Sequence, residues 1–400
     1  MFRSILSSRN KNPIKLLLFT EQRSNLLSTH LRFLHNGIPK SQSEEPEEPI
    51  KDQSSFTVSY LINSCGLSSK SAAAAAGQIC IKTPQNPDSI LSFLKSFGLT
   101  STQIARLISK RPSILMSRVE KTLKPKLSYF LNAGFSTAQL AELLCLDTSL
   151  LRSSLPNRLK PNFELLSSVI GDVQRTYAAF RRNSRLMSNN LETNFLPNVK
   201  TLRSYEVPDE KITFLAAWYP RTLMLPAEKF GTVVASIAKF GFDPSSTLFV
   251  QGVSALGGLE PCAWEKKVAL YKSLGWSAEE IVSAFRKQPF CMSLSEEKMR
   301  KVAGFFTKEM SCSPSLLATK PVLLCLSFER RILPRCSVLS VLVSKGLLTR
   351  ELGQISFLKV KTERFLAQYL AKYAERAPEI LEVYEGRMTL QDFNIQFMNL

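Results

Sequence analysis

The sequence predicts an all-α fold, a superhelical solenoid of about nine helical repeats of about 35 residues each. The first observation behind this prediction is a recurring glycine, followed by a bulky apolar residue and then Ser, Thr or Asp. The second is a recurring proline, offset from the glycine. The third is a chain that is 44% hydrophobic but shows no alternating β pattern. One such repeat cannot bury its apolar face alone, so neighbouring repeats must stack into a continuous core.

The glycine motif sets the period of the repeat. With Gly171 and the glycine-free segments 205–207 and 310–312 counted as copies, eight intervals averaging 35 residues separate the first glycine from the last. Self-similarity at this spacing is typical of helical solenoids. The motif is clearest at Gly66, Gly98, Gly134, Gly241 and Gly275, and at Gly346 with one extra residue.

Two proline markers keep register with the glycines, which indicates that the copies share an internal plan. The first marker follows a leucine by one or two residues, at Pro125, Pro161, Pro197 and Pro334. The second is Pro-x-x-(Leu/Met), at Pro112, Pro220, Pro289 and Pro321, with Thr148 and Asn183 in the proline position of two further copies.

Residues 253–261, with two adjacent glycines, are the least regular stretch of the sequence. They predict a degenerate repeat or a bend.

Local rules divide each repeat into helices, as residues 88–125 illustrate. Apolar residues at helical spacing predict a first helix that opens at Asp88 and ends at Gly98. Thr100 with Gln103 forms a capping-box pattern that starts a second helix, and Pro112 stops it. A short third helix is predicted from Val119 to Lys124, before Pro125 begins the next repeat. The capping-box pattern recurs at Ser136 with Gln139 and at Ser277 with Glu280.

The first 40 residues differ from the repeats. They hold seven Lys or Arg, one acid and scattered Ser and Leu, a composition typical of an organellar presequence, with a disordered basic tail as the alternative. The arginines favour the mitochondrion over the chloroplast. The next segment contains four glutamates and two prolines, which predict an acidic disordered spacer. We therefore expect a presequence at 1–40, a spacer at 41–55, the repeat domain at 56–384 and a tail at 385–400.

Charge points to a polyanionic partner. The whole chain carries a net charge of +19, and residues 55–400 alone carry +17, from 44 Lys plus Arg against 27 acids. A solenoid with this excess presents an extended basic surface. Basic clusters recur near the ends of second helices and in the third segments, so we predict that they share one face, although each alone also fits a solvated helix end. These candidate nucleic-acid-binding residues are Lys110, Arg111, Lys124, Lys126, Arg158, Lys160, Arg181, Arg182, Arg185, Lys266, Lys267, Arg286, Lys287, Arg300, Lys301, Arg330 and Arg331.

Catalysis has few candidate residues in this sequence. Both histidines, His30 and His35, lie in the expected presequence, which leaves none for a catalytic triad, a general base or a zinc site in the repeats. The eight cysteines form no Cys-x-x-Cys pair and lie mostly among apolar neighbours. No Gly-x-x-x-x-Gly-Lys-(Ser/Thr) phosphate loop occurs, and no apolar run is long enough to span a membrane. We expect no enzyme, no cofactor, no metal and no membrane span.

The combined markers resemble those of a known family. Residues 93–126 carry (Phe/Leu)-x-x-x-Gly-(Phe/Leu/Trp)-(Ser/Thr)-x-x-(Gln/Glu), then Pro-x-x-Leu and Leu-Lys-Pro-Lys, and this pattern resembles the mTERF repeat of the mitochondrial transcription termination factors. Residues 270–301 resemble the large plant branch, and the resemblance runs from about Phe56 to Tyr384. Glu206 and Ser311 depart from it where glycine is expected. The Trp-x-x-Leu-Gly-x-x-Tyr pattern of tetratricopeptide repeats is absent here, and pentatricopeptide repeats lack the proline markers. The resemblance implies a left-handed superhelix, with two long helices and one short helix per repeat and a basic groove for nucleic acid.

The resemblance and the charge together predict a monomeric organellar protein that binds DNA or RNA and acts with transcription or splicing proteins. Double-stranded DNA is favoured because the resemblance implies a shape suited to a duplex, with transcription termination or regulation as the role. RNA binding for intron splicing or transcript maturation is one alternative. A protein-interaction scaffold that holds an acidic partner is the other.

Overall fold

The computed structural model describes residues 50–260, 262–348 and 355–397, and every regular element in these ranges is helical. The chain divides into two compact units, Met1–Gly231 and Thr232–Leu400, and the boundary falls inside helix α13 (Ala227–Lys239). Within each unit the chain repeats a first helix, a tight turn and a second helix that returns antiparallel. The predicted all-α helical repeat fold is therefore confirmed. The predicted presequence lies outside the described residues.

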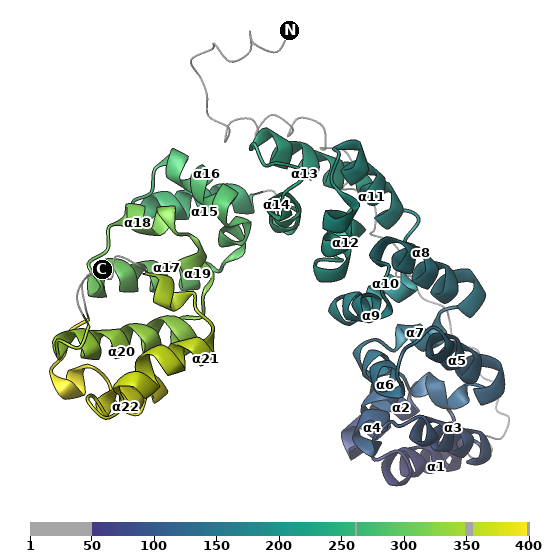
Figure 1. Cartoon of the computed structure of the whole chain (residues 1–400). Coiled ribbons are helices and arrows are strands. Elements are labelled where there is room, and N and C mark those ends of the chain that lie inside the picture. The colour runs from purple at the N-terminus through teal and green to yellow at the C-terminus, as the bar shows by residue number, and fades with distance from the viewer. Residues whose placement is uncertain (1–49, 261, 349–354, 398–400) are drawn as a thin grey trace, which may run out of the picture. The chain divides into compact units, whose positions relative to one another are not determined.

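The N-terminal unit stacks its helical hairpins in two rows. Successive second helices contact one another, and Figure 1 shows α5, α8 and α11 on one side of this unit with α6, α9 and α12 on the other. Helix α1 begins inside the segment predicted as an acidic spacer. The first helices are α1 (Ile50–Asn63), α3 (Gln85–Ser96), α5 (Lys124–Asn132), α8 (Lys160–Ile170) and α11 (Phe195–Ser204). The second helices are α2 (Ser69–Ala76), α4 (Ser101–Lys110), α6 (Thr137–Leu146), α9 (Val173–Arg182) and α12 (Asp209–Trp218).

From α4 onward in the N-terminal unit, a short helix connects each second helix to the next first helix, whereas residues 77–84 between α2 and α3 hold no helix. The short helices are η3 (Pro112–Met116), α7 (Ser149–Arg152), α10 (Arg185–Ser188) and η6 (Thr222–Met224). Wide π-helical turns, η4 (Val119–Leu123) and η5 (Leu155–Leu159), then open α5 and α8. The prediction of a separate third helix at 119–124 is thus wrong, because this segment is the opening turn of α5. The short helix of that repeat lies earlier, at η3, where only the end of the second helix was predicted.

Proline accounts for the wide opening turn. The amide of Lys124 donates to the carbonyl of Val119, five residues back, and Pro125 follows with no N–H of its own. A proline ring clashes with the carbonyl four residues before it, and a turn closed by a five-residue hydrogen bond relieves that contact. The same bond precedes the other three marker prolines, from Lys160 to Leu155, Leu196 to Leu191 and Leu333 to Phe328.

The C-terminal unit follows the same plan with more variation. Helix α14 (Thr247–Gly257) runs through much of the stretch predicted to be irregular, and a Cβ added at Gly252 would lie 3.1 Å from Cδ1 of Ile237. Glycine is therefore used here for close helix packing. After α14 come α15 (Ala263–Ser273), α16 (Ala278–Lys287), η7 (Pro289–Ser293), α17 (Glu296–Gly304), η8 (Phe305–Glu309), α18 (Pro314–Thr319) and α19 (Val322–Cys325). The last elements are η9 (Phe328–Ile332), α20 (Leu333–Ser344), η10 (Ile355–Leu358), α21 (Thr362–Phe365), η11 (Leu366–Ala371), α22 (Glu379–Glu385) and η12 (Gln391–Phe393).

The turns between first and second helices match the predicted positions. All nine predicted turn residues, including Glu206 and Ser311, adopt left-handed backbone with φ between +53° and +98°. At Glu206, one of the two glycine-free turns, the amide of Val207 donates to the carbonyl of Leu202. The amide of Phe135 donates to the carbonyl of Phe130 in the same way beside Gly134. These bonds satisfy the last free carbonyls of the first helix. The missing glycines therefore leave the turn geometry unchanged.

Helix starts are confirmed at the capping boxes and corrected at one other position. The reciprocal side-chain and backbone bonds of the capping box are present at Thr100, Ser136 and Ser277. Helix α3 begins at Gln85 and not at the predicted Asp88, because a helix accepts proline in its first turn and Pro87 lies there. The Asp88 carboxylate instead accepts a hydrogen bond of 2.5 Å from the hydroxyl of Tyr60 in the preceding repeat.

Candidate nucleic-acid interface

One edge of the repeats carries the short helices, the π turns and the helix ends that adjoin them, and we call it the connector edge. Because the two helices of a repeat are antiparallel, the start of the first helix lies beside the short helix that follows the second. Buried Asn198, directly after Pro197, donates from Nδ2 to the carbonyls of Leu223 at 3.0 Å and Leu225 at 2.7 Å. Asn162 donates in the same way to the carbonyls of Leu186, Met187 and Asn189.

Charged side chains play this role in other repeats. Lys126 Nζ donates to the carbonyl of Leu151, and burial lowers the pKa of this buried lysine. Lys267 Nζ donates to the carbonyl of Leu294. Each donor satisfies a carbonyl that has no partner within its own short helix or the connector beyond it. Two residues predicted to bind nucleic acid, Lys126 and Lys267, are therefore part of the framework of the connector edge and not of its free surface.

Several other predicted cations hold helix ends. Lys110 Nζ donates to the carbonyl of Cys145 in the last turn of the next second helix, at 3.0 Å. Arg286 Nε donates to the carbonyl of Phe240, and Arg111 Nε donates to Oγ1 of Thr148 at 3.3 Å. Lys110 and Arg286 lie at carbonyls that end helices, where a cation complements the helix dipole, whereas Arg111 bonds a side-chain hydroxyl at the start of α7. For Lys110 and Arg286 the structure shows the helix-end role that any single basic cluster could have had.

A further group of predicted cations is paired with carboxylates on the surface. Exposed ion pairs stabilise a protein by about 0–1 kcal/mol at most, so a phosphate can replace the carboxylate at small cost. The Lys301 ammonium donates to Glu329 at 2.5 Å, and this bond lowers the pKa of that carboxyl. The pairs are Lys124 with Glu120, Lys160 with Glu164, Arg181 with Glu142, Arg300 with Glu296 and Lys301 with Glu329.

The remaining predicted cations project from the connector edge without a side-chain partner. Within the described ranges their side chains make no hydrogen bond or ion pair, and all are exposed or half-exposed. In the N-terminal unit the elements that carry Arg158 and Arg185, η5 and α10, contact each other. The set comprises Arg158 and Arg185 in the N-terminal unit, and Lys266, Lys287, Arg330 and Arg331 in the C-terminal unit.

Three more exposed arginines of the connector edge were missed by the sequence analysis. Arg118 lies between η3 and η4, Arg152 ends α7, and Arg221 precedes η6. A search for adjacent basic residues passes over them because none has Lys or Arg directly beside it. The signal was present for Arg221, which directly follows the proline of a Pro-x-x-Leu marker.

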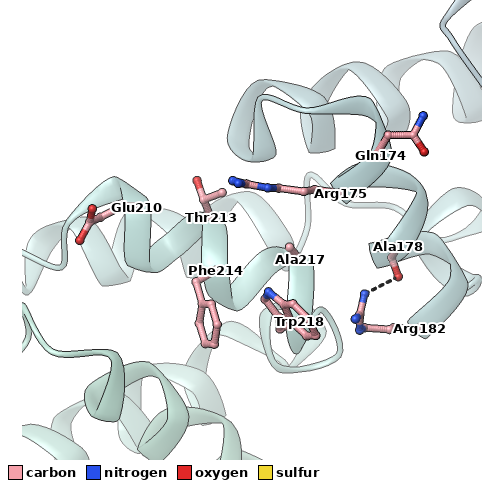
Figure 2. Close-up of a pocket in the computed structure, with 9 residues that line it drawn as sticks. All are labelled: Gln174, Arg175, Ala178, Arg182, Glu210, Thr213, Phe214, Ala217 and Trp218. Atoms are coloured by element: carbon pink, nitrogen blue, oxygen red, sulfur yellow. Dashed lines mark hydrogen bonds between the residues drawn. The ribbon is translucent and has the colours of Figure 1, made fainter. Parts of the chain in front are cut away.

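A groove of about 480 Å³ lies between the second helices α9 and α12 of the N-terminal unit. Its lining includes Arg175 and Arg182 from α9, and Phe214 and Trp218 from α12 (Figure 2). The guanidinium carbon of Arg182 lies 4.3 Å from the centroid of the Trp218 ring, a cation–π contact. Arg182 also donates from Nη1 to the carbonyl of Ala178 at 3.1 Å. The sequence analysis included Arg182 but did not identify Trp218.

Among the described residues, no group of three or more His, Cys, Asp and Glu side chains is placed to hold a metal ion. Burial raises the pKa of the Cys65 and Cys291 thiols to about 12 and that of Cys312 to about 11. Thiols of this kind are poor nucleophiles at neutral pH. No helix in the same ranges combines the length and apolar character needed to cross a membrane.

Comparison with known proteins places this architecture in one family. No curated protein matches the chain. The mTERF family model matches residues 79–366, which is well over half of the sequence. This range includes both proline markers and eight of the nine left-handed turns described above. The chain therefore belongs to the mTERF family.

Proposed function

We propose that this protein binds organellar nucleic acid, with double-stranded DNA as the favoured ligand, and regulates transcription, for example its termination. Family membership supports a nucleic-acid-binding role in organellar gene expression. The observation that carries the proposal is the recurrence of exposed, unpartnered cations at the connector edge of both units. Cations that recur along the same edge of several repeats suit a polyanion, whose charges also recur along its length.

The chemistry of the edge supports backbone contact more than base recognition. Lys and Arg neutralise phosphates and position a protein on nucleic acid, whereas specificity requires contacts to base edges or DNA shape. The unpartnered cations, such as Arg185 and Lys287, would meet phosphates first. The ion-paired cations, such as Arg181 and Lys301, would follow by exchanging a carboxylate for a phosphate, a change that retains a charge-assisted hydrogen bond.

A salt series tests the proposal. The whole chain is titrated with labelled random-sequence duplex DNA, single-stranded RNA and structured RNA of equal length, and anisotropy is read at several salt concentrations. With about eight phosphates neutralised, the logarithm of the affinity for duplex DNA should fall against the logarithm of salt with a slope near about −7. A slope near zero would remove the electrostatic basis of the proposal.

A matched pair of variants locates the contact on the molecule. Arg185→Gln removes an unpartnered cation of the connector edge, and the slope should become shallower by about one. Lys95→Gln removes an exposed cation from the last turn of α3, at the opposite edge of its repeat beside Gly98. This control should leave the slope unchanged. Equal effects of the two variants would show that the connector edge is not the interface.

The other outcomes assign the alternative functions. Preference for RNA would redirect the role to intron splicing or transcript maturation. Absence of binding to all three nucleic acids would favour a scaffold whose basic edge holds an acidic protein. We further propose that the protein acts as a monomer beside the transcription machinery of the organelle, and light scattering of the complex would test this.

Mitochondrial location is the remaining part of the proposal, supported by the seven Lys or Arg and single acid among residues 1–40. A fluorescent protein fused after these residues should enter mitochondria. Import into chloroplasts would support the alternative, and a diffuse signal would contradict both.

A further inference from the structure

The groove between α9 and α12 leaves a large aromatic ring, that of Trp218, exposed to solvent. Trp218 is 54% exposed, whereas the two other tryptophans of the chain, Trp264 and Trp276, are each 4% exposed. Exposed aromatic area of this size is unfavourable in water and is typical of binding surfaces. Two guanidinium groups line the same groove, and in Figure 2 Arg175 points from α9 toward α12 while Arg182 lies beside the Trp218 ring.

We propose that this groove binds an unpaired nucleotide of a single-stranded nucleic acid, with its base stacked on Trp218 and its phosphate held by Arg182. The inference rests on the proposed nucleic-acid-binding function and adds to it a site for unpaired bases. Stacking platforms beside basic side chains are the general means by which proteins hold single strands.

The contacts of Arg182 can be exchanged for those of such a ligand. The guanidinium now covers the Trp218 ring and donates to the Ala178 carbonyl at 3.1 Å. A base can take the place of the guanidinium on the ring, because every base presents a flat π face. A phosphate can take the place of the carbonyl, and a charged acceptor forms the stronger hydrogen bond with arginine. On binding, the Trp218 ring would therefore exchange the guanidinium for a base, and the Arg182 guanidinium would exchange the ring and the carbonyl for a phosphate.

The size and the charge of the groove favour an unpaired nucleotide. Its volume of about 480 Å³ is within the usual range for small-ligand sites, and a paired base inside a duplex has no free face to offer. Glu210 also lines the groove, at the first turn of α12, while Arg182 and Trp218 lie at the far ends of their helices. The negative phosphate is therefore expected at the Arg182 end.

Another repeat of the same unit supplies a matched control. Leu146 ends helix α6 as Trp218 ends α12, and it is similarly exposed, at 48%. Leucine has apolar area but no π face for stacking. If apolar contact alone retained the ligand, loss of either side chain would have the same effect.

Tryptophan fluorescence reads the site directly, because the other two tryptophans are buried. The whole chain is titrated with oligothymidylate, oligouridylate and a random-sequence duplex of equal length, and emission and anisotropy are recorded together. We expect single strands to quench the emission and to protect it from acrylamide. Trp218→Ala should weaken single-strand binding about tenfold. Trp218→Phe should restore most of the loss, and Leu146→Ala should change nothing.

Affinity for the duplex distinguishes a failure of this proposal from a failure of the function on which it rests. Trp218→Ala should leave affinity for the duplex unchanged, since the connector edge makes that contact. Single-strand binding without quenching, or equal losses for Trp218→Ala and Leu146→Ala, would overturn the groove proposal while the function stands. Quenching by polyglutamate that oligothymidylate does not reverse would also overturn it. No binding to any nucleic acid would overturn the function itself.

Discussion

The first residues of the first helices and the last residues of the second helices lie at the same edge of the repeats but differ in how they use side chains. Lys126, Asn162, Asn198 and Arg335 each follow a marker proline, and all four are buried and donate to connector carbonyls. Lys110, Leu146, Arg182 and Trp218 end four successive second helices at intervals of 36 residues, and all are exposed.

The difference shows what constrains each position. At the buried position the backbone leaves carbonyls that need donors, so chemically different side chains are selected for one common property. At the exposed position water can satisfy every group, so cation, leucine and tryptophan can alternate. Diversity at the helix ends is therefore available for ligand binding, whereas diversity at the buried position is not.

Removal of the largest buried donor should have the largest effect on stability. Arg335 donates from Nη1 to the carbonyls of Phe357 and Val360, each at 2.8 Å, and stacks on the Phe365 ring. Arg335→Ala leaves these carbonyls unsatisfied and should lower the free energy of unfolding by about 3–5 kcal/mol. Urea denaturation followed by circular dichroism measures it. Arg330→Ala, at an exposed site, is the control and should cost less than about 0.5 kcal/mol.

An isosteric change separates hydrogen bonding from packing. Asn162→Asp keeps the shape of the side chain but replaces the amide donor by a carboxylate that repels the three carbonyls. We expect a loss of about 2–4 kcal/mol in the free energy of unfolding. Asn157→Asp makes the same chemical change at an exposed position of η5 and should be close to neutral. Similar losses for both variants would contradict the donor role of Asn162.

The turns at the opposite edge test whether the left-handed backbone conformation, and not the type of residue, determines stability there. Gly134 has φ of +98° and Glu206 has φ of +58°. Gly134→Ala should destabilise by about 1–2 kcal/mol because of the strained left-handed backbone. Glu206→Gly relieves such strain and should stabilise by a smaller amount, since glycine also loses more chain entropy on folding. Thermal unfolding measures both, and a destabilising Glu206→Gly would show that the side chain contributes more than the strain.

The burial of Lys126 should make the free energy of unfolding depend on alkaline pH, which an exposed lysine would not do. Burial lowers its pKa in the folded state, so the unfolded chain binds a proton more readily as pH rises between the two pKa values. The stability of the native chain relative to Lys126→Met should therefore increase with pH up to the unfolded value near about 10.4. Unfolding free energies at several alkaline pH values give this difference, and Lys95→Met is the exposed control. A flat difference would indicate that Lys126 is solvated.

The smallest effect on stability is expected from an exchange between helix ends. Lys110→Leu and Leu146→Lys swap the residues of equivalent exposed positions, and each should change the free energy of unfolding by less than about 0.5 kcal/mol. Lys110 already donates to the carbonyl of Cys145, so the salt slope of duplex binding should change less for Lys110→Leu than for Arg185→Gln. A large loss of stability in either variant would remove the distinction between the two regions.

The turns and caps were predictable because their causes are local. A left-handed residue, a capping box or a proline acts on a hydrogen bond within about six residues, so the signal and its effect lie in the same short window. This is why all nine turns were found, including those at Glu206 and Ser311. The opening turn at 119–123 was assigned to a separate helix because Pro125 suits the start of the next one, whereas η4 runs directly into α5.

The sequence by itself determined the period, the turn positions, the capping and the excess of positive charge, since each depends on residue type and spacing alone. Only the tertiary structure decided which charges are free. Lys126 is buried because a carbonyl 25 residues away needs its donor, and Arg182 faces Trp218 because adjacent repeats stack. The reason is physical: the free energy of a charge depends on the solvent and partners around it, and stacking alone decides where those lie.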